Sequence, residues 1–371
     1  MNLLSLRELI VREIEERGPM PFSRYMELCL YEPGLGFYER SEEIFGKAGD
    51  FYTSSDVHAL FGRLLARQFE EMWRALGSSA RVEIIELGPG RGLFARDVLD
   101  WSRKKFPEFF GALNYRLVER SAVLRLRLAE RLKEALEEGK ASIAEDLAPP
   151  AAENAILFAN EFLDALPVEV VSDRGLLQLA LRDGALAETF APVPSEIQEY
   201  LDRYSVIPEA GERVEAGLAA MAWMERLAKT VARGFLVLVD YGYRREELLA
   251  GRHRGTLVVA RRHQLSRNPY EVPGEQDITA HVNFTAVAAA GEAVGLQTLG
   301  LVTQSQFLMG IGEANQFADA FEECRLPQEQ AKVSLQLKHL VTPAGMGENF
   351  QVLVMGKGVA AGELSGLKFC R

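Results

Sequence analysis

Hydrophobic positions at helical spacing mark the start of the chain. Hydrophobic side chains recur along one face of a helix predicted here; they are Leu6, Leu9, Ile10 and Ile14. Ser5 and Glu8 have the spacing of a capping box, and Gly18 ends the predicted helix. Glycine, proline and aromatic residues then dominate residues 19–57, which predicts an ordered loop region with little helix. A second hydrophobic stripe, in HALFGRLLARQFEEMWRALG, predicts a long helix with one face in a core.

From residue 81 onward, short apolar runs alternate with amphipathic stretches. Helices are predicted over 91–104 and 121–137, between strands in the segments VEIIEL, NYRLVE, ASIAED, AILFANE and GFLVLVDYG. Strands that alternate with helices predict an α/β fold with right-handed crossovers and a parallel sheet.

Between residues 168 and 234 this alternation stops. The segments VEVVSDRG, LLQLALRDG and ALAETF read as a small antiparallel meander, and a helix is predicted over 212–234. After GTLVVARRH, the sequence predicts a helix near 279–294, a strand in LQTLGLV, a helical stretch over 305–340 and a last strand in FQVLVMGKG. We therefore expect an N-terminal helical and loop extension (1–80), a first core part (81–167), an inserted α+β subdomain covering the substrate side (168–233) and a second core part (234–371).

Composition narrows the classes of protein. The 371 residues are 48% hydrophobic and 26% charged, as in folded proteins with a core, and a net charge of −11 disfavours nucleic-acid binding while favouring basic partners. Cys29, Cys324 and Cys370 have neither metal-site nor disulfide spacing, so we expect no metal. No apolar run approaches the roughly 18 residues of a membrane span, and the acidic N-terminal segment does not resemble a transit peptide, so a cytoplasmic location is expected.

Three glycines follow the first core strand, in the sequence ELGPGRG. A strand that turns into a helix through Gly88, Gly90 and Gly92 is typical of a nucleotide-binding α/β fold. The dinucleotide pattern G-x-G-x-x-G requires its third glycine at the position of Leu93, so the spacing disfavours a nicotinamide cofactor.

S-adenosylmethionine fits this spacing better, because it has no phosphate group. A backbone turn through Pro89 and the glycines allows close approach of its methionine part and ribose, and Glu86 is placed to receive its ammonium group. A glycine turn without a nucleotide role remains an alternative.

Polar residues at the ends of the next strands support a nucleoside site. Glu119 follows the second strand, where a carboxylate accepts hydrogen bonds from ribose hydroxyls. Asp146 follows the third strand and is placed to accept the adenine amino group, with Leu147 beside it. The fourth strand runs into FANEFLDALPVEV, whose polar residues lie where open α/β sheets bind ligands; these are Asn160, Glu161 and Asp164.

At this point the chain resembles the MidA-type methyltransferases, which include a mitochondrial assembly factor of respiratory complex I that methylates arginine. The resemblance rests on the segments YEPGLGFY, GDFYTSSDVHALFGRLLA, ELGPGRG, NEFLDALPVEV, LVDYG, PGEQDITAHVNF and MGENFQVLVMGKG. It implies a seven-stranded, Rossmann-like class I methyltransferase core, S-adenosylmethionine as cofactor and, for the mitochondrial member, symmetric dimethylation of a protein arginine.

An arginine acceptor requires carboxylates, because the guanidinium group stays charged and its fork of donors matches a carboxylate. Glu161 is the first candidate for orienting it, with Asn160 sharing this role and Asp164 and Asp240 as further candidates. His281, in TAHVNF, is a candidate proton acceptor, with a structural role as the alternative. The segment GDFYTSS is predicted to close over the cofactor through Asp50, Thr53 and Ser54.

Three classes of function stay open from the sequence. The first is a methyltransferase acting on a protein with an exposed arginine, in the assembly of a respiratory complex. The second is a methyltransferase-like assembly factor without turnover, and the third is an NAD-dependent oxidoreductase. The sequence leaves the oligomeric state open, a homodimer included.

Overall fold

A computed structural model of the chain describes residues 4–40, 59–147, 152–248, 255–261, 264–266, 268–343, 345–359 and 362–370. The chain divides into two compact units, each built from three segments. Unit 1 contains Met1–Phe51, Leu163–Trp223 and Gly242–Ala290, and unit 2 contains Tyr52–Phe162, Met224–Tyr241 and Gly291–Arg371.

Unit 2 is built on a central mixed sheet. Its strands are β2 (Val82–Leu87), β3 (Leu113–Val118), β4 (Ala141–Ala144), β5 (Ala152–Asn160), β10 (Val231–Tyr243), β15 (Gln297–Thr303) and β16 (Phe350–Lys357), in the order β15-β16-β10-β5-β2-β3-β4. The strands from β4 to β10 are parallel, as predicted. β16, for which the sequence predicted a strand without a direction, is antiparallel to both of its neighbours. It starts where β15 ends, with Thr303 beside Gln351.

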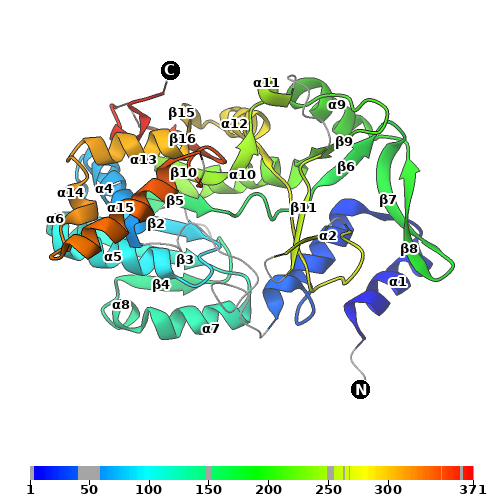
Figure 1. The fold of residues 1–371 in the computed structure, drawn as a ribbon, viewed down its shortest axis with the longest axis horizontal. Helices are drawn as coiled ribbons and strands as arrows, with labels where there is room; N and C mark the ends of the chain where they lie inside the picture. Colours follow the sequence, from blue (N-terminus) through cyan, green and yellow to red (C-terminus); the bar gives the residue numbers. More distant parts are fainter. Residues whose placement is uncertain are drawn as a thin grey trace. The chain divides into compact units, whose positions relative to one another are not determined.

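Helices cover this sheet and bury the predicted apolar stripe. They are α4 (Ala59–Ala75), α5 (Leu93–Lys105), α6 (Pro107–Ala112), α7 (Ala122–Arg131), α8 (Lys133–Glu137), α13 (Gln304–Glu313), α14 (Ala318–Phe321) and α15 (Pro327–Val341), with η2 (Ser365–Leu367) near the end of the chain. In Figure 1, α4, α5 and α15 gather beside the strands of unit 2. Phe61, Leu65 and Phe69 of α4 lie fully buried in one core with Ile84 and Phe158 of the sheet, which confirms the predicted core face of this helix.

Unit 1 combines short helices with antiparallel strands. Its elements are α1 (Leu6–Arg17), β1 (Met20–Pro21), α2 (Phe22–Tyr31), η1 (Phe37–Glu39), β6 (Glu169–Ser172), β7 (Gly175–Arg182), β8 (Ala185–Ala191), α9 (Ser195–Tyr204), β9 (Arg213–Ala216), α11 (Arg245–Leu248), β11 (Val258–Arg261), β12 (Gln264–Ser266), β13 (Asp277–Thr279) and β14 (Val282–Asn283). Two helices, α10 (Leu218–Thr230) and α12 (Phe284–Ala293), begin in unit 1 and end in unit 2. The predicted meander is confirmed, because β6, β7 and β8 pair antiparallel in order.

The N-terminal helix forms as predicted. The hydroxyl of Ser5 accepts the amide of Glu8, the Glu8 carboxylate accepts the amide of Ser5, and Gly18 caps the end of α1. A box of this kind satisfies backbone donors that the first turn of a helix leaves without partners.

Two local predictions in unit 1 were wrong. Residues 22–31 form the helix α2 inside the predicted loop region, because tertiary packing buries its apolar side chains, among them Tyr25 and Met26. The helix predicted over 212–234 begins later, because Arg213–Ala216 pair with β6 as the strand β9. Sequence periodicity alone does not separate a buried strand end from a helix start.

Candidate active site

The glycine turn lies between β2 and α5. Gly88, Gly90 and Gly92 have φ angles of 58°, 50° and 69°, a left-handed region that glycine adopts without steric cost. A Cβ atom at Gly88 would lie 3.0 Å from Cδ2 of Phe162, and one at Gly92 would lie 2.6 Å from Cδ2 of Leu128. The turn therefore needs glycine for both its backbone conformation and its space.

Backbone hydrogen bonds align the residues that follow the parallel strands. The amide of Gly88 donates to the carbonyl of Val118, the amide of Glu119 to the carbonyl of Ala144, and the amide of Glu161 to the carbonyl of Val239, at 3.1, 2.9 and 2.9 Å. The glycine turn and the predicted site residues of unit 2 thus meet at one edge of the sheet, where open α/β proteins bind ligands.

Glu86 lies beneath the glycine turn as a buried carboxyl group, 4% exposed. The hydroxyl of Tyr115 donates to its Oε2 atom at 2.8 Å. Burial raises the pKa of Glu86 to about 8, against the opposing effect of this hydrogen bond. Tyr115 was not predicted as a site residue, because an aromatic residue in a strand is usually a core residue.

The predicted nucleoside residues differ in their surroundings. Glu119 is buried and accepts the amide of Ser121 at 2.8 Å. Asp146 is exposed; its Oδ1 atom accepts the amide of Leu147 at 2.8 Å and also binds Arg226 of α10. Arg226 was not predicted, since it comes from a helix far along the chain.

Asn160 and Glu161 form a linked pair at the end of β5. The amide nitrogen Nδ2 of Asn160 donates to Oε1 of Glu161 at 2.9 Å. Among the described residues, the buried Oδ1 atom of Asn160 has no hydrogen-bond partner. Glu161 has a φ of 51°, a left-handed conformation that costs a residue with a side chain about 1–3 kcal/mol and that is common at functional sites. This pair therefore combines a strained backbone with a hydrogen-bond acceptor available to a ligand.

Asp240, in β10, binds the backbone that follows the Asn160–Glu161 pair. Its side chain is 1% exposed and accepts two backbone amides, that of Phe162 at 3.1 Å and that of Tyr241 at 2.9 Å. These bonds fix the backbone just after Glu161. Asp240 is therefore suited to hold the loop, whereas the sequence had suggested it as a direct contact to the acceptor.

Asp164 and His281 belong to unit 1. Asp164 is buried, and its backbone carbonyl accepts the amide of Ala280 at 2.9 Å. After burial, Asp277 and Tyr31, the charge of Asp164 also contributes to raising the pKa of Tyr38. The backbone amide of His281 donates to the hydroxyl of Thr256 at 3.1 Å. Removal of water from around the imidazole lowers the pKa of His281.

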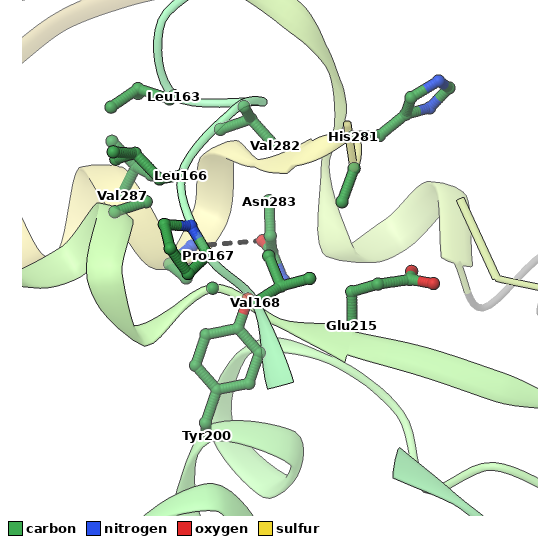
Figure 2. A pocket seen from close by; sticks show the side chains of 14 residues that line it. Leu163, Leu166, Pro167, Val168, Tyr200, Glu215, His281, Val282, Asn283 and Val287 are labelled. Atoms are coloured by element: carbon green, nitrogen blue, oxygen red, sulfur yellow. Dashed lines mark hydrogen bonds between the residues drawn. The ribbon is translucent and has the colours of Figure 1, made fainter. Parts of the chain in front are cut away.

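A small pocket in unit 1 has His281 in its lining (Figure 2). It encloses about 20 Å³, room for a single water molecule. Its polar side chains already have protein partners: Glu215 accepts the amide and the hydroxyl of Thr256, and Asn283 donates to the carbonyl of Tyr204. The remaining lining is mostly apolar. This pocket is too small and too well satisfied internally to serve as a nucleoside site.

Asp50, Thr53 and Ser54, the predicted cofactor-closing residues, lie outside the described residues, so their role stays a prediction. Unit 2 itself has the groups that a nucleoside with an amino-acid part requires. These are a turn of three glycines with positive φ angles, buried carboxyl groups at Glu86 and Glu119, and the Oδ1 acceptor of Asn160. The fold and the site therefore define an α/β protein that binds such a nucleoside.

Comparison with known proteins identifies the family. Residues 64–302 match a family model described as "Putative S-adenosyl-L-methionine-dependent methyltransferase". The chain is 31% identical to the mitochondrial protein arginine methyltransferase NDUFAF7 homolog of Drosophila melanogaster, over 97% of this chain and 86% of that protein. It is 27% identical to the human mitochondrial protein arginine methyltransferase NDUFAF7, over 94% and 82%. The chain therefore belongs to this family of S-adenosylmethionine-dependent methyltransferases.

A solved structure supports the same cofactor. A Burkholderia thailandensis protein bound to S-adenosyl-homocysteine is 29% identical to the chain, with a TM-score of 0.85 and coverage of 98% of this chain and 95% of that one. The cofactor is S-adenosylmethionine, as predicted, and the nicotinamide alternative is excluded.

The comparisons also correct one expectation. The relatives from Drosophila melanogaster, Mus musculus and Homo sapiens are named as mitochondrial proteins, so the prediction of a cytoplasmic location was wrong. Across the described residues, no helix has both the length and the apolar composition needed to cross a bilayer.

Proposed function

We propose that this chain methylates an arginine side chain of a protein substrate, with symmetric dimethylation as the product and the assembly of a respiratory complex as the setting. The observation that carries the proposal is the hydrogen-bonded Asn160–Glu161 pair at the edge of the sheet where the parallel strands end. The relatives of this chain are named protein arginine methyltransferases. A carboxylate at this edge suits a guanidinium group, since it accepts two parallel hydrogen bonds from the guanidinium fork.

In this proposal the bound cofactor supplies an electrophilic methyl group. The glycine turn, Glu86 and Glu119 hold the cofactor, with Asp146 and Leu147 at the adenine. Glu161 fixes the plane of the guanidinium group so that one nitrogen faces the methyl carbon, and this alignment supplies much of the rate enhancement. Asn160 holds the Glu161 carboxylate through Nδ2, and its Oδ1 atom accepts a ligand N–H or O–H group.

The proposed function also implies an assignment of the strands of unit 2. The strands β15-β16-β10-β5-β2-β3-β4 correspond to the seven strands of a class I methyltransferase core, with residues 1–80 as an N-terminal extension. The inserted segment 168–233 serves as the substrate-side cover, and Asp164 is a candidate for contact with the acceptor protein. For His281 the surroundings favour the structural alternative.

Methyl labelling tests the proposal directly. Purified protein is incubated with a lysate and isotope-labelled S-adenosylmethionine, and labelled proteins are analysed by mass spectrometry for symmetric dimethylarginine. We expect Glu161→Ala to lower transfer at least 100-fold while its affinity for S-adenosylhomocysteine stays within threefold. Asp183→Ala is the matched control, because Asp183 is also an acidic residue with a left-handed backbone, at a φ of 50°, and lies in an exposed turn.

Calorimetry separates the alternatives. Wild-type protein is expected to bind S-adenosylmethionine but not NAD, and Gly90→Val is expected to abolish that binding, because Gly90 has a φ of 50° that a β-branched residue adopts only with strain. Cofactor binding without any labelled arginine in the lysate would contradict the enzymatic proposal and favour an assembly factor without turnover.

A further inference from the structure

Within the described part of the chain, the buried carboxyl group of Glu86 stands among neutral side chains. In register it stands beside Leu117 of β3 and Phe158 of β5, and its side chain is 4% exposed. Among the described residues, the hydrogen bond to its carboxyl group comes from the hydroxyl of Tyr115, at 2.8 Å. Burial of a carboxylate without a cation is costly, and a protein lowers this cost by keeping the group protonated.

Charged side chains of the neighbouring strands are engaged elsewhere. Glu83 of β2 and Arg116 of β3 form an ion pair of 2.6 Å, and strand alternation turns Glu83 to the face opposite Glu86. Glu119 accepts the amide of Ser121 at the end of β3. Within the described part of the chain, the two strands that flank β2 therefore form no ion pair with Glu86.

Within the described ranges, no cation of the helices packed on this face is among the groups that shift the pKa of Glu86. α4 and α5 contribute apolar side chains to the shared core, including Phe69 and Phe94. Their arginines pair with carboxylates other than Glu86, namely Arg63 with Glu323, Arg67 with Asp319, Arg74 with Glu70, Arg96 with Asp97 and Arg103 with Glu138. Arg91 of the glycine turn is not among the groups that shift the pKa of Glu86.

These surroundings determine the protonation states of Glu86 and Tyr115. Burial raises the pKa of Glu86 to about 8, and the hydrogen bond from Tyr115 limits the rise. Burial and the neighbouring Glu86 also raise the pKa of Tyr115 well above its usual value. Tyr115 therefore keeps its proton and remains a hydrogen-bond donor, while Glu86 is mostly protonated at neutral pH.

We propose that Glu86 holds a proton in the cofactor-free protein and releases it to solvent when the ammonium group of S-adenosylmethionine binds, with Tyr115 as the residue that positions the carboxyl group. The inference rests on the predicted contact between Glu86 and this ammonium group. The O–H bond of Glu86 breaks, the proton passes to buffer, and the resulting carboxylate accepts a hydrogen bond from the ammonium group. No electron is transferred.

The driving force is the new positive charge. An opposite charge within about 4–6 Å lowers a carboxyl pKa by about 1–3 units, which brings Glu86 below neutral pH in the complex. Cofactor binding therefore becomes tighter as pH rises toward the pKa of the free protein. Measurements belong below about pH 7.5, because a free α-amino group begins to lose its own proton at about 7.7–8.0.

Titration calorimetry with S-adenosylhomocysteine tests the proposal without an acceptor protein. At pH 6.5, binding heats in two buffers with different protonation enthalpies give the number of protons released. We expect at least half a proton per site for wild-type protein and close to none for Glu86→Gln. Glu83→Gln, on the opposite face of the same strand, is the matched control and should behave like wild type. The dissociation constant of wild type should fall at least threefold from pH 6 to pH 7.

Tyr115→Phe provides a second, independent variant. Loss of its hydroxyl removes the hydrogen bond that favours the charged form of Glu86, so the pH dependence of binding should move to higher pH. Thermal unfolding establishes that each variant is folded; if Glu86→Gln is not, the wild-type and Tyr115→Phe titrations still decide. Equal binding heats in both buffers, or no binding of S-adenosylhomocysteine, would overturn the proposal. Normal proton release without methyl transfer to arginine would instead overturn only the proposed function.

Discussion

Both units bury carboxyl groups, yet they use them differently. In unit 1, Glu215 is buried at the pocket and accepts both the amide and the hydroxyl of Thr256. In unit 2, Glu86 receives a hydrogen bond from the neutral Tyr115, and the buried Oδ1 atom of Asn160 has no partner within the described residues. The pocket carboxyl group of Glu215 in unit 1 is therefore satisfied by Thr256, whereas the ends of the parallel strands in unit 2 keep an acceptor for a ligand at Asn160.

This difference shows why burial alone does not identify a functional site. Buried polar groups in proteins are nearly all hydrogen-bonded, so an acceptor without a partner requires an explanation. A ligand with matching donors is one such explanation, and the glycine turn provides the close backbone approach that this ligand needs.

The largest expected effect comes from removing one buried carboxylate from each unit. Asp240→Ala removes the buried carboxylate that accepts the amides of Phe162 and Tyr241, and we expect a loss of about 2–3 kcal/mol in the free energy of unfolding. We also expect its affinity for S-adenosylhomocysteine to fall at least tenfold, because the backbone after Glu161 loosens. Denaturant unfolding and calorimetry measure the two quantities.

Glu215→Ala is the counterpart in unit 1. It removes the acceptor of the Thr256 amide and hydroxyl, so its loss of stability should be similar to that of Asp240→Ala. Its affinity for S-adenosylhomocysteine should stay within twofold of wild type. Equal losses of affinity in the two variants would break the distinction between the units.

The next largest effect is expected in the pH dependence of the free energy of unfolding. Burial raises the pKa of both Glu86 and Glu215 above the usual value, so the folded state binds more protons than the unfolded chain between about pH 4.5 and the raised pKa. Stability therefore falls as pH rises through this window, by up to about 1.4 kcal/mol per pH unit for each group. Glu86→Gln and Glu215→Gln should each remove part of this slope.

Ligand addition distinguishes the two contributions. S-adenosylhomocysteine should cancel the part of the slope that Glu86→Gln removes, because the bound ammonium group stabilises the charged form. The part due to Glu215 should persist. Denaturant midpoints from pH 5 to pH 8, with and without ligand, provide the test, and a slope insensitive to ligand would contradict the role of Glu86.

A smaller effect is expected at matched glycines. Gly92 and Gly139 both have a φ of 69°, so replacement by alanine should cost each about 1–2 kcal/mol in backbone strain. A Cβ atom at Gly139 meets no atom within 4 Å, whereas at Gly92 it meets Leu128. Gly92→Ala should weaken binding of S-adenosylhomocysteine about tenfold and Gly139→Ala should leave it unchanged. Equal effects on binding would show that the turn acts only through stability.

The sequence predicted the strand-end edge of unit 2 well, because its signals are local. Three glycines after an apolar strand specify a turn with positive φ angles, and these angles are present at Gly88, Gly90 and Gly92. Glu86 and Glu119 could be placed in the same way, since parallel strands bring their carboxyl ends to one edge.

What the sequence could not supply were contacts between distant segments. The bond from Tyr115 to Glu86 joins two strands, and the bond of Arg226 to Asp146 joins residues far apart in the chain. The antiparallel direction of β16 and the helix α2 depend on tertiary packing that periodicity does not encode. His281 and Asp164 were placed in the site by their motifs alone, and their assignment to unit 1 required the structure.

The smallest effect is expected at His281. The hydrogen bond from His281 to Thr256 uses the backbone amide, so His281→Ala retains it. The pKa of the imidazole is lowered, so the ring is neutral near pH 7. Figure 2 shows the ring turned away from the other labelled side chains of the pocket. We expect less than about 0.5 kcal/mol change in stability, as for most surface substitutions, and methyl transfer within threefold of wild type. A 100-fold loss of transfer with normal binding of S-adenosylhomocysteine would instead make His281 the proton acceptor that its motif suggested, and would give unit 1 a direct part in the chemistry.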